Sequence, residues 1–132
     1  MRATVIILLA CATASARLYC PVTYEITKTG VDKSTFVAEV EVESNTLTKY
    51  WSGYYYDVKV KYVKLLRWWH DWLTEEKMRA TLSEIIYIHS GCGVYLRPGQ
   101  KYIIGCLNDE ECNFAKTVDS LTPNEKVLAN VQ

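Results

Sequence analysis

Cysteine usage constrains this chain more than any other feature of its sequence. Cys11 lies in an apolar N-terminal stretch, and Cys20, Cys92, Cys106 and Cys112 follow it. Four cysteines in an oxidising compartment form two disulfides by default, and three pairings are possible. A zinc site is the competing interpretation, but Cys106 and Cys112, the closest pair, have five residues between them and no neighbouring histidine. We therefore expect two disulfides, no metal site and no cofactor.

The N-terminus has the pattern of a secretory signal peptide. Arg2 precedes an apolar run over residues 5–12, and Ala14-Ser15-Ala16 forms a small-residue cleavage site. This run is too short to span a bilayer, and no later stretch has the roughly 20 apolar residues of a membrane helix. The sequence predicts that residues 1–16 are removed and that residues 17–132 form one soluble, extracellular domain.

The segment from Cys92 to Cys106 has the pattern of a β-hairpin. Two apolar runs, residues 94–96 and 102–104, flank the turn signal Arg97-Pro98-Gly99-Gln100, in which Pro pre-sets φ and Gly tolerates positive φ. A three-residue loop would place Cys92 opposite Cys106, close enough for a disulfide to clamp the open end of the hairpin.

Alternation of apolar and polar residues predicts three further strands. Residues 36–43 alternate apolar side chains with glutamates, and residues 54–64 alternate them with Asp57 and lysines. These opposite charges favour antiparallel pairing of the two strands, with the charged side chains on a solvated sheet face. The third strand covers residues 81–89, which are almost continuously apolar from Ile85 to Ile88.

Three tryptophans lie in residues 65–80, where apolar residues recur at helical spacing. We expect a short helix or structured loop here. Its period points Trp69 and Trp72 inward and leaves Trp68 the most exposed. In this interpretation the tryptophan rings fill one end of the barrel. The alternative is that they anchor a binding partner.

Near the C-terminus, Thr122-Pro123-Asn124-Glu125 has the form of a helix capping box and predicts a helix over about residues 123–131. Five short strands, one helical insertion and this C-terminal helix suit a mainly β fold, a small five-stranded barrel of the OB type. A two-sheet sandwich is the alternative, but it usually has about seven strands.

Patterns for catalysis are missing from the sequence. His70 and His89 are its only histidines, and it contains no H-E-x-x-H, no G-x-S-x-G and no Gly-rich phosphate loop. The acidic run at residues 109–111 is contiguous and lacks the alternating ligand spacing of a calcium loop. With 15 Lys and Arg against 15 Asp and Glu, the charge indicates neither a nucleic-acid nor a membrane surface. We do not expect an enzyme.

Several motifs, taken together in their order and spacing, resemble the netrin-like module. More narrowly, they resemble the inhibitory N-terminal domain of tissue inhibitors of metalloproteinases, which has an OB-type barrel. The similarity covers nearly all of residues 17–132. The motifs are Cys20-Pro21-Val22, Tyr56 to Lys61, Glu84 to Tyr87, Cys92-Gly93-Val94, Gly99 to Gly105, Cys112-Asn113-Phe114 and Asp119 to Thr122.

Members of that family insert their mature N-terminus into the protease cleft, where the amine and carbonyl of a first cysteine chelate the catalytic zinc. The resemblance places Leu18 at the position of that cysteine, and Cys92 at the position of the cysteine that normally holds it. With the hairpin geometry, it implies the pairs Cys20–Cys112 and Cys92–Cys106. The partner-binding residues it implies are Leu18, Tyr19, Cys20, Pro21, Val22, Ser90 and Gly91.

Two hypotheses about function follow. One is a secreted, monomeric, divergent inhibitor that wedges into an extracellular zinc metalloproteinase with a weakened zinc contact. The other is a non-inhibitory netrin-like module that binds another extracellular protein or a glycan. Neither hypothesis involves nucleic acid or a membrane.

Overall fold

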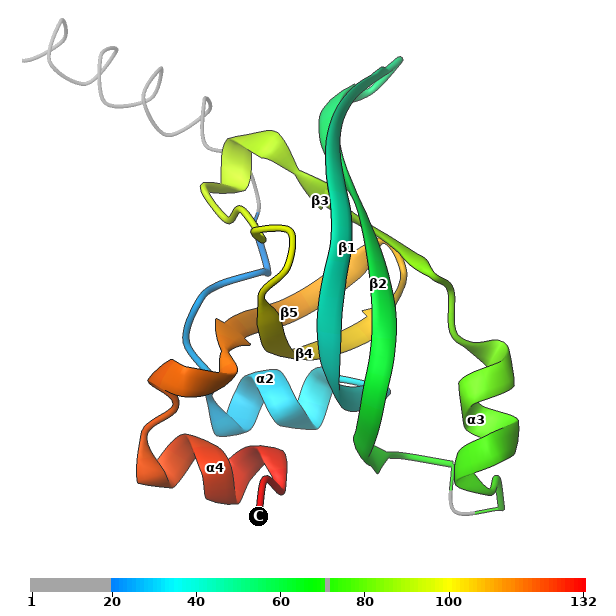
Figure 1. Ribbon diagram of the computed structural model, residues 1–132, viewed down its shortest axis with the longest axis vertical. Coiled ribbons are helices and arrows are strands. Elements are labelled where there is room, and N and C mark those ends of the chain that lie inside the picture. The colour runs from blue at the N-terminus through cyan, green and yellow to red at the C-terminus, as the bar shows by residue number, and fades with distance from the viewer. Residues whose placement is uncertain (1–19, 71) are drawn as a thin grey trace, which may run out of the picture.

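The computed structural model describes residues 20–70 and 72–132, so the predicted signal peptide, Leu18 and Tyr19 lie outside the described residues. Five strands form one antiparallel sheet in the order β3-β2-β1-β4-β5 (Figure 1). The strands are β1 (Phe36–Tyr50), β2 (Gly53–Trp68), β3 (Ile85–His89), β4 (Lys101–Asn108) and β5 (Glu111–Thr117). The helices are α2 (Lys28–Lys33), α3 (Glu75–Thr81) and α4 (Pro123–Ala129), with 3-10 turns at Ser90–Cys92 and Val118–Ser120. The prediction of a mainly β fold with an inserted and a C-terminal helix is confirmed.

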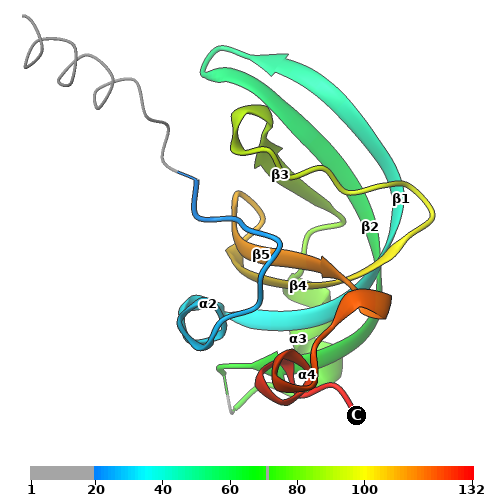
Figure 2. The same ribbon diagram turned by 90° about the vertical axis from the view of Figure 1, so that its left-hand side faces the viewer.

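The long ribbon of β1 and β2 organises the sheet. Its register sets Glu39 opposite Lys64 and Glu41 opposite Lys61, so the antiparallel pairing predicted from opposite charges is confirmed. Irregularities shift the register at three points along β1, and such bulges bend and twist a ribbon. As a result, β1 and β2 curve across the whole molecule and project beyond the other strands (Figures 1 and 2).

The sheet is coiled but not closed into a barrel, contrary to the expected closure. Among the described residues no ladder joins β3 to β5. Instead, a hydrogen bond joins the edge of β3 to the turn between β4 and β5. The Tyr87 amide of β3 donates to the Asp109 carbonyl in this turn at 2.8 Å. A seam therefore remains along the edge of β3.

One predicted element is wrong, and another is shorter than expected. Residues 94–96 form no hairpin strand with β4, because β4 pairs with β1 and β5. Val94 and Leu96 are apolar because they fill the core from an extended loop. The inserted helix predicted within residues 65–80 is present but short, since β2 continues to Trp68 and α3 spans only Glu75–Thr81.

Apolar side chains are buried on both faces of the sheet, which hides the simple alternation of a half-buried strand. One core fills the concave side of the sheet. The other lies between the opposite face and helices α2 and α4. Leu65 packs in the first and its neighbour Leu66 in the second, so consecutive positions are both buried. The second core consists of Ile26, Val31, Val37, Leu66, Ile103, Phe114 and Ala129.

Helix α4 begins at the predicted capping box, which is confirmed. Thr122 Oγ1 accepts from the Glu125 amide at 3.1 Å, and Glu125 Oε1 accepts from the Thr122 amide at 2.9 Å. The buried Glu125 carboxylate also accepts from the Ile26 amide at 2.9 Å and from Lys116 Nζ at 2.7 Å. One carboxylate thus joins α4, β5 and the N-terminal segment.

These contacts set the ionisation of Glu125. Burial favours the neutral carboxyl and would raise its pKa, but the hydrogen bonds from Lys116 and from the Thr122 and Ile26 amides outweigh it and lower the pKa to about 2. Because the folded pKa lies below the unfolded value of about 4.3, the ionised group stabilises the fold above that value. The stabilisation is lost as the pH falls toward 2.

Glu125→Gln tests this linkage. We expect the variant to lose about 1–3 kcal/mol of unfolding free energy at pH 7, because Lys116 and two amides lose a charged acceptor. Its stability should then fall less steeply than that of the wild type between pH 5 and pH 2. Chemical denaturation across this range measures both effects, with Glu76→Gln on the exposed face of α3 as control. Parallel pH curves for Glu125→Gln and the wild type would contradict the account.

Candidate functional site

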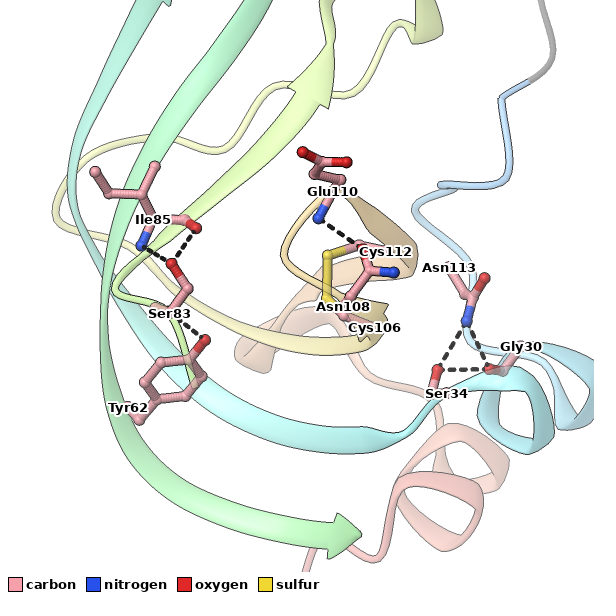
Figure 3. The surroundings of a disulfide bond; sticks show 10 residues. All are labelled: Gly30, Ser34, Tyr62, Ser83, Ile85, Cys106, Asn108, Glu110, Cys112 and Asn113. Atoms are coloured by element: carbon pink, nitrogen blue, oxygen red, sulfur yellow. Dashed lines mark hydrogen bonds between the residues drawn. A yellow bond between two sulfur atoms is a disulfide. The ribbon is translucent and has the colours of Figure 1, made fainter. Parts of the chain in front are cut away.

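The disulfides join Cys20 to Cys92 and Cys106 to Cys112, with Cα–Cα distances of 5.4 Å and 3.8 Å. The predicted pairs, Cys20–Cys112 and Cys92–Cys106, are therefore wrong. Cys106 lies on β4 directly opposite Cys112 on β5, which follows from the β4–β5 pairing that the sequence pattern missed (Figure 3). Cys92 instead ends the turn after β3, beside the N-terminal segment.

The Cys20–Cys92 disulfide builds a ridge, defined here as Cys20, Pro21, Ser90, Gly91 and Cys92. It ties together two segments that are 72 residues apart in sequence. Gly91 is exposed and the other four residues are half-buried. Four of the predicted partner-binding residues, Cys20, Pro21, Ser90 and Gly91, therefore lie at one place on the surface.

Local contacts hold each side of the ridge. In the turn after β3, the Gly91 amide donates to His89 Nδ1 at 3.0 Å, and Gly93 ends the turn with a φ of 75°, a conformation that favours glycine. On the other side, Thr23 pairs with β5 through main-chain hydrogen bonds of 3.2 Å and 2.9 Å. Figure 2 shows this segment (blue) passing beside β5 to α2. Val22, predicted to bind a partner, faces the core and is 7% exposed.

The tryptophans do not lie as predicted. Trp68 is half-buried against the core and its Nε1 donates to the Leu73 carbonyl at 3.0 Å. Trp69 is 40% exposed over the Arg67 guanidinium, and Trp72 is 78% exposed. The predicted order of exposure is wrong because a strand, with its period of two, continues through Trp68. Trp51, at the tip of the β1–β2 hairpin, is fully exposed.

An aromatic cluster next to the ridge was missed by the sequence analysis. Val58, Ile86 and Ile88 face the core, so alternation places Tyr55 and His89 on the opposite face of β2 and β3. Their rings meet edge to face with centroids 4.9 Å apart. The alternation of residues 54–60, which the sequence analysis did use, was the available signal for this cluster.

Metal-ligand clusters and membrane-spanning helices are absent from the described part of the chain. Within it, no three His, Cys, Asp or Glu side chains gather to hold a metal ion. None of its helices combines the length and apolar character needed to cross a bilayer.

Removing each disulfide in turn tests how much it constrains the fold. In the chain-entropy model, replacing Cys20 and Cys92 by Ser opens a loop of separation 72 and should cost about 4 kcal/mol of unfolding free energy. The same change at Cys106 and Cys112, at separation 6, should cost about 2 kcal/mol. Denaturant titration of the two double variants measures both costs. A larger loss for the short loop would contradict this ranking.

Comparisons with known proteins identify the family. The family model for AceES-2, excretory-secretory protein 2, matches residues 18–130. The crystal structure of Ancylostoma ceylanicum excretory-secretory protein 2 matches with a TM-score of 0.54 and 23% identity, over 84% of this chain and 93% of that one, and so shows a shared fold. No curated protein matches. These matches support the resemblance to the netrin-like module, but not the narrower resemblance to tissue inhibitors of metalloproteinases. Together with the disulfides, they indicate a secreted protein. The chain belongs to the excretory-secretory protein 2 family.

Proposed function

We propose that this protein is a secreted netrin-like module that binds another extracellular protein through the ridge. The observation that carries the proposal is the Cys20–Cys92 disulfide, which fixes two distant segments side by side at the surface. A surface that is ordered before binding loses less conformational entropy in the complex. The exposed Gly91 lets a partner approach the backbone closely.

Inhibition of a zinc metalloproteinase is the second candidate, and the observed disulfide favours it. In the resemblance, the cysteine at the position of Cys92 holds the chelating first residue. Here Cys92 holds Cys20, so Cys20 takes the anchored position that the resemblance gave to Leu18. Cleavage after Ala16 would leave Arg17, Leu18 and Tyr19 in front of Cys20. The free amine would then be displaced from the anchored residue, and zinc chelation would be weak.

A ridge-directed variant tests the first proposal. Gly91→Gln adds a long uncharged side chain at the exposed residue of the ridge, and Ala80→Gln makes the matched change at an exposed residue of α3. Both are tested with the wild type against a panel of purified extracellular proteins, zinc metalloproteinases included. We expect the wild type and Ala80→Gln to bind the same panel member, and Gly91→Gln to lose that binding. A panel partner that binds Gly91→Gln as tightly as the wild type would contradict the use of the ridge.

The two candidates are separated by comparing mature protein that begins at Arg17 with a form that begins at Cys20. If the partner is a metalloproteinase, the Cys20 form should inhibit it more strongly, since its amine is freed at the anchored position. Enzyme titration measures this difference. No inhibition by either form at micromolar concentration would remove the protease candidate and leave a non-catalytic partner.

A further inference from the structure

An open groove follows the edge of β3 at the seam of the sheet. One hollow of about 570 Å³ lies between the aromatic residues Tyr50, Trp51, Tyr55 and Tyr87 and the acidic β4–β5 turn. A second hollow of about 360 Å³ shares Tyr55, Tyr87 and the turn with the first, and it continues to Pro21 and Cys92 at the ridge. The two hollows share these lining residues, and together they are here called the seam groove.

The aromatic wall of the seam groove is fixed in place. The Tyr50 ring meets those of Tyr55 and Tyr87 edge to face, with centroids 5.8 Å and 6.2 Å apart. Its hydroxyl donates to Asp57 Oδ2 at 2.7 Å. This hydrogen bond, with burial and the Asp57 charge, raises the pKa of Tyr50 to about 12, so the ring stays neutral. Aromatic faces carry a negative quadrupole that attracts cations.

The opposite wall is acidic and has no basic partner among the described residues. Asp109 and Glu110 line the first hollow, and Glu110 and Glu111 line the second. Ion pairs in the described part of the chain join Lys28, Lys59 and Lys116 to carboxylates elsewhere. In Figure 3 the Glu110 carboxylate points away from the Cys106–Cys112 disulfide. Behind the aromatic wall, Asp57 Oδ1 is shielded from solvent and accepts no hydrogen bond.

We propose that the seam groove binds the guanidinium or ammonium group of an Arg or Lys side chain in an extended segment of a partner protein. Aromatic side chains on one wall and unpaired carboxylates on the other are complementary to such a group. A segment fits better than a free cation because the hollows reach the ridge, and the fully exposed Trp51 offers a large aromatic contact at the other end. This inference rests on the proposed function, in which the same partner covers the ridge.

The probes are a blocked peptide, acetyl-Gly-Gly-Arg-Gly-Gly-amide, its citrulline counterpart and tetramethylammonium. Backbone amide NMR titration of the wild type should show the Arg peptide shifting the signals of Tyr55, Tyr87 and Glu110, with the citrulline peptide causing little change. Asp109→Asn combined with Glu110→Gln should weaken binding about tenfold. Trp51→Ala should weaken it about two- to fivefold.

Matched controls are Glu76→Gln and Trp72→Ala, which alter an exposed carboxylate and an exposed indole outside the groove. Neither should change binding of the Arg peptide. The Arg peptide tests the groove without the ridge partner, so loss of the ridge partner and failure of the groove can be told apart. Equal binding of the citrulline peptide, or unchanged binding by the double variant, would overturn the proposal. Tetramethylammonium binding as tightly as the Arg peptide would overturn the choice of a protein segment.

Discussion

The Cys20–Cys92 disulfide is the constraint on which the proposed binding surface depends. It fastens the N-terminal segment to the turn after β3, and the same segment is held again where Thr23 pairs with β5 and where the Ile26 amide meets Glu125. Three contacts of different kinds therefore fix this short stretch of chain. The disulfide lies at the surface and joins both sides of the ridge, so the ridge keeps its shape without a partner.

The incomplete closure of the sheet gives the surface its second part. A strand edge without a neighbour normally exposes unpaired backbone groups. Here the acidic β4–β5 turn lies against the edge of β3 and takes up the Tyr87 amide, but it leaves the seam groove open beside it. Carboxylates and tyrosines thus gather where a closed barrel would have buried a ladder. The ridge and the groove share lining residues, so one partner could cover both.

The sequence predicted those elements whose signals are local. Alternation and opposite charges located β1 and β2 and their pairing, and four consecutive residues located the start of α4. The misses have a common physical cause, which is burial without a simple period. Val94 and Leu96 are buried in a loop, so their segment had the pattern of a strand. Leu65 and Leu66 are buried on opposite faces of the sheet, so their segment had the spacing of a helix. The wrong hairpin led to the wrong pair Cys92–Cys106, and the family resemblance led to the wrong pair Cys20–Cys112. The aromatic wall of the groove was missed because its residues come from three strands.

Disulfide mapping without reduction tests the central claim most directly. Cleavage after Lys and Arg should release three cysteine peptides: one with Cys20, one with Cys92, and one that carries both Cys106 and Cys112. The structure predicts that the first two are joined to each other and that the third is separate, closed on itself. Either alternative pairing would join all three peptides into one species. Recovery of that species would contradict the ridge and the account of binding built on it.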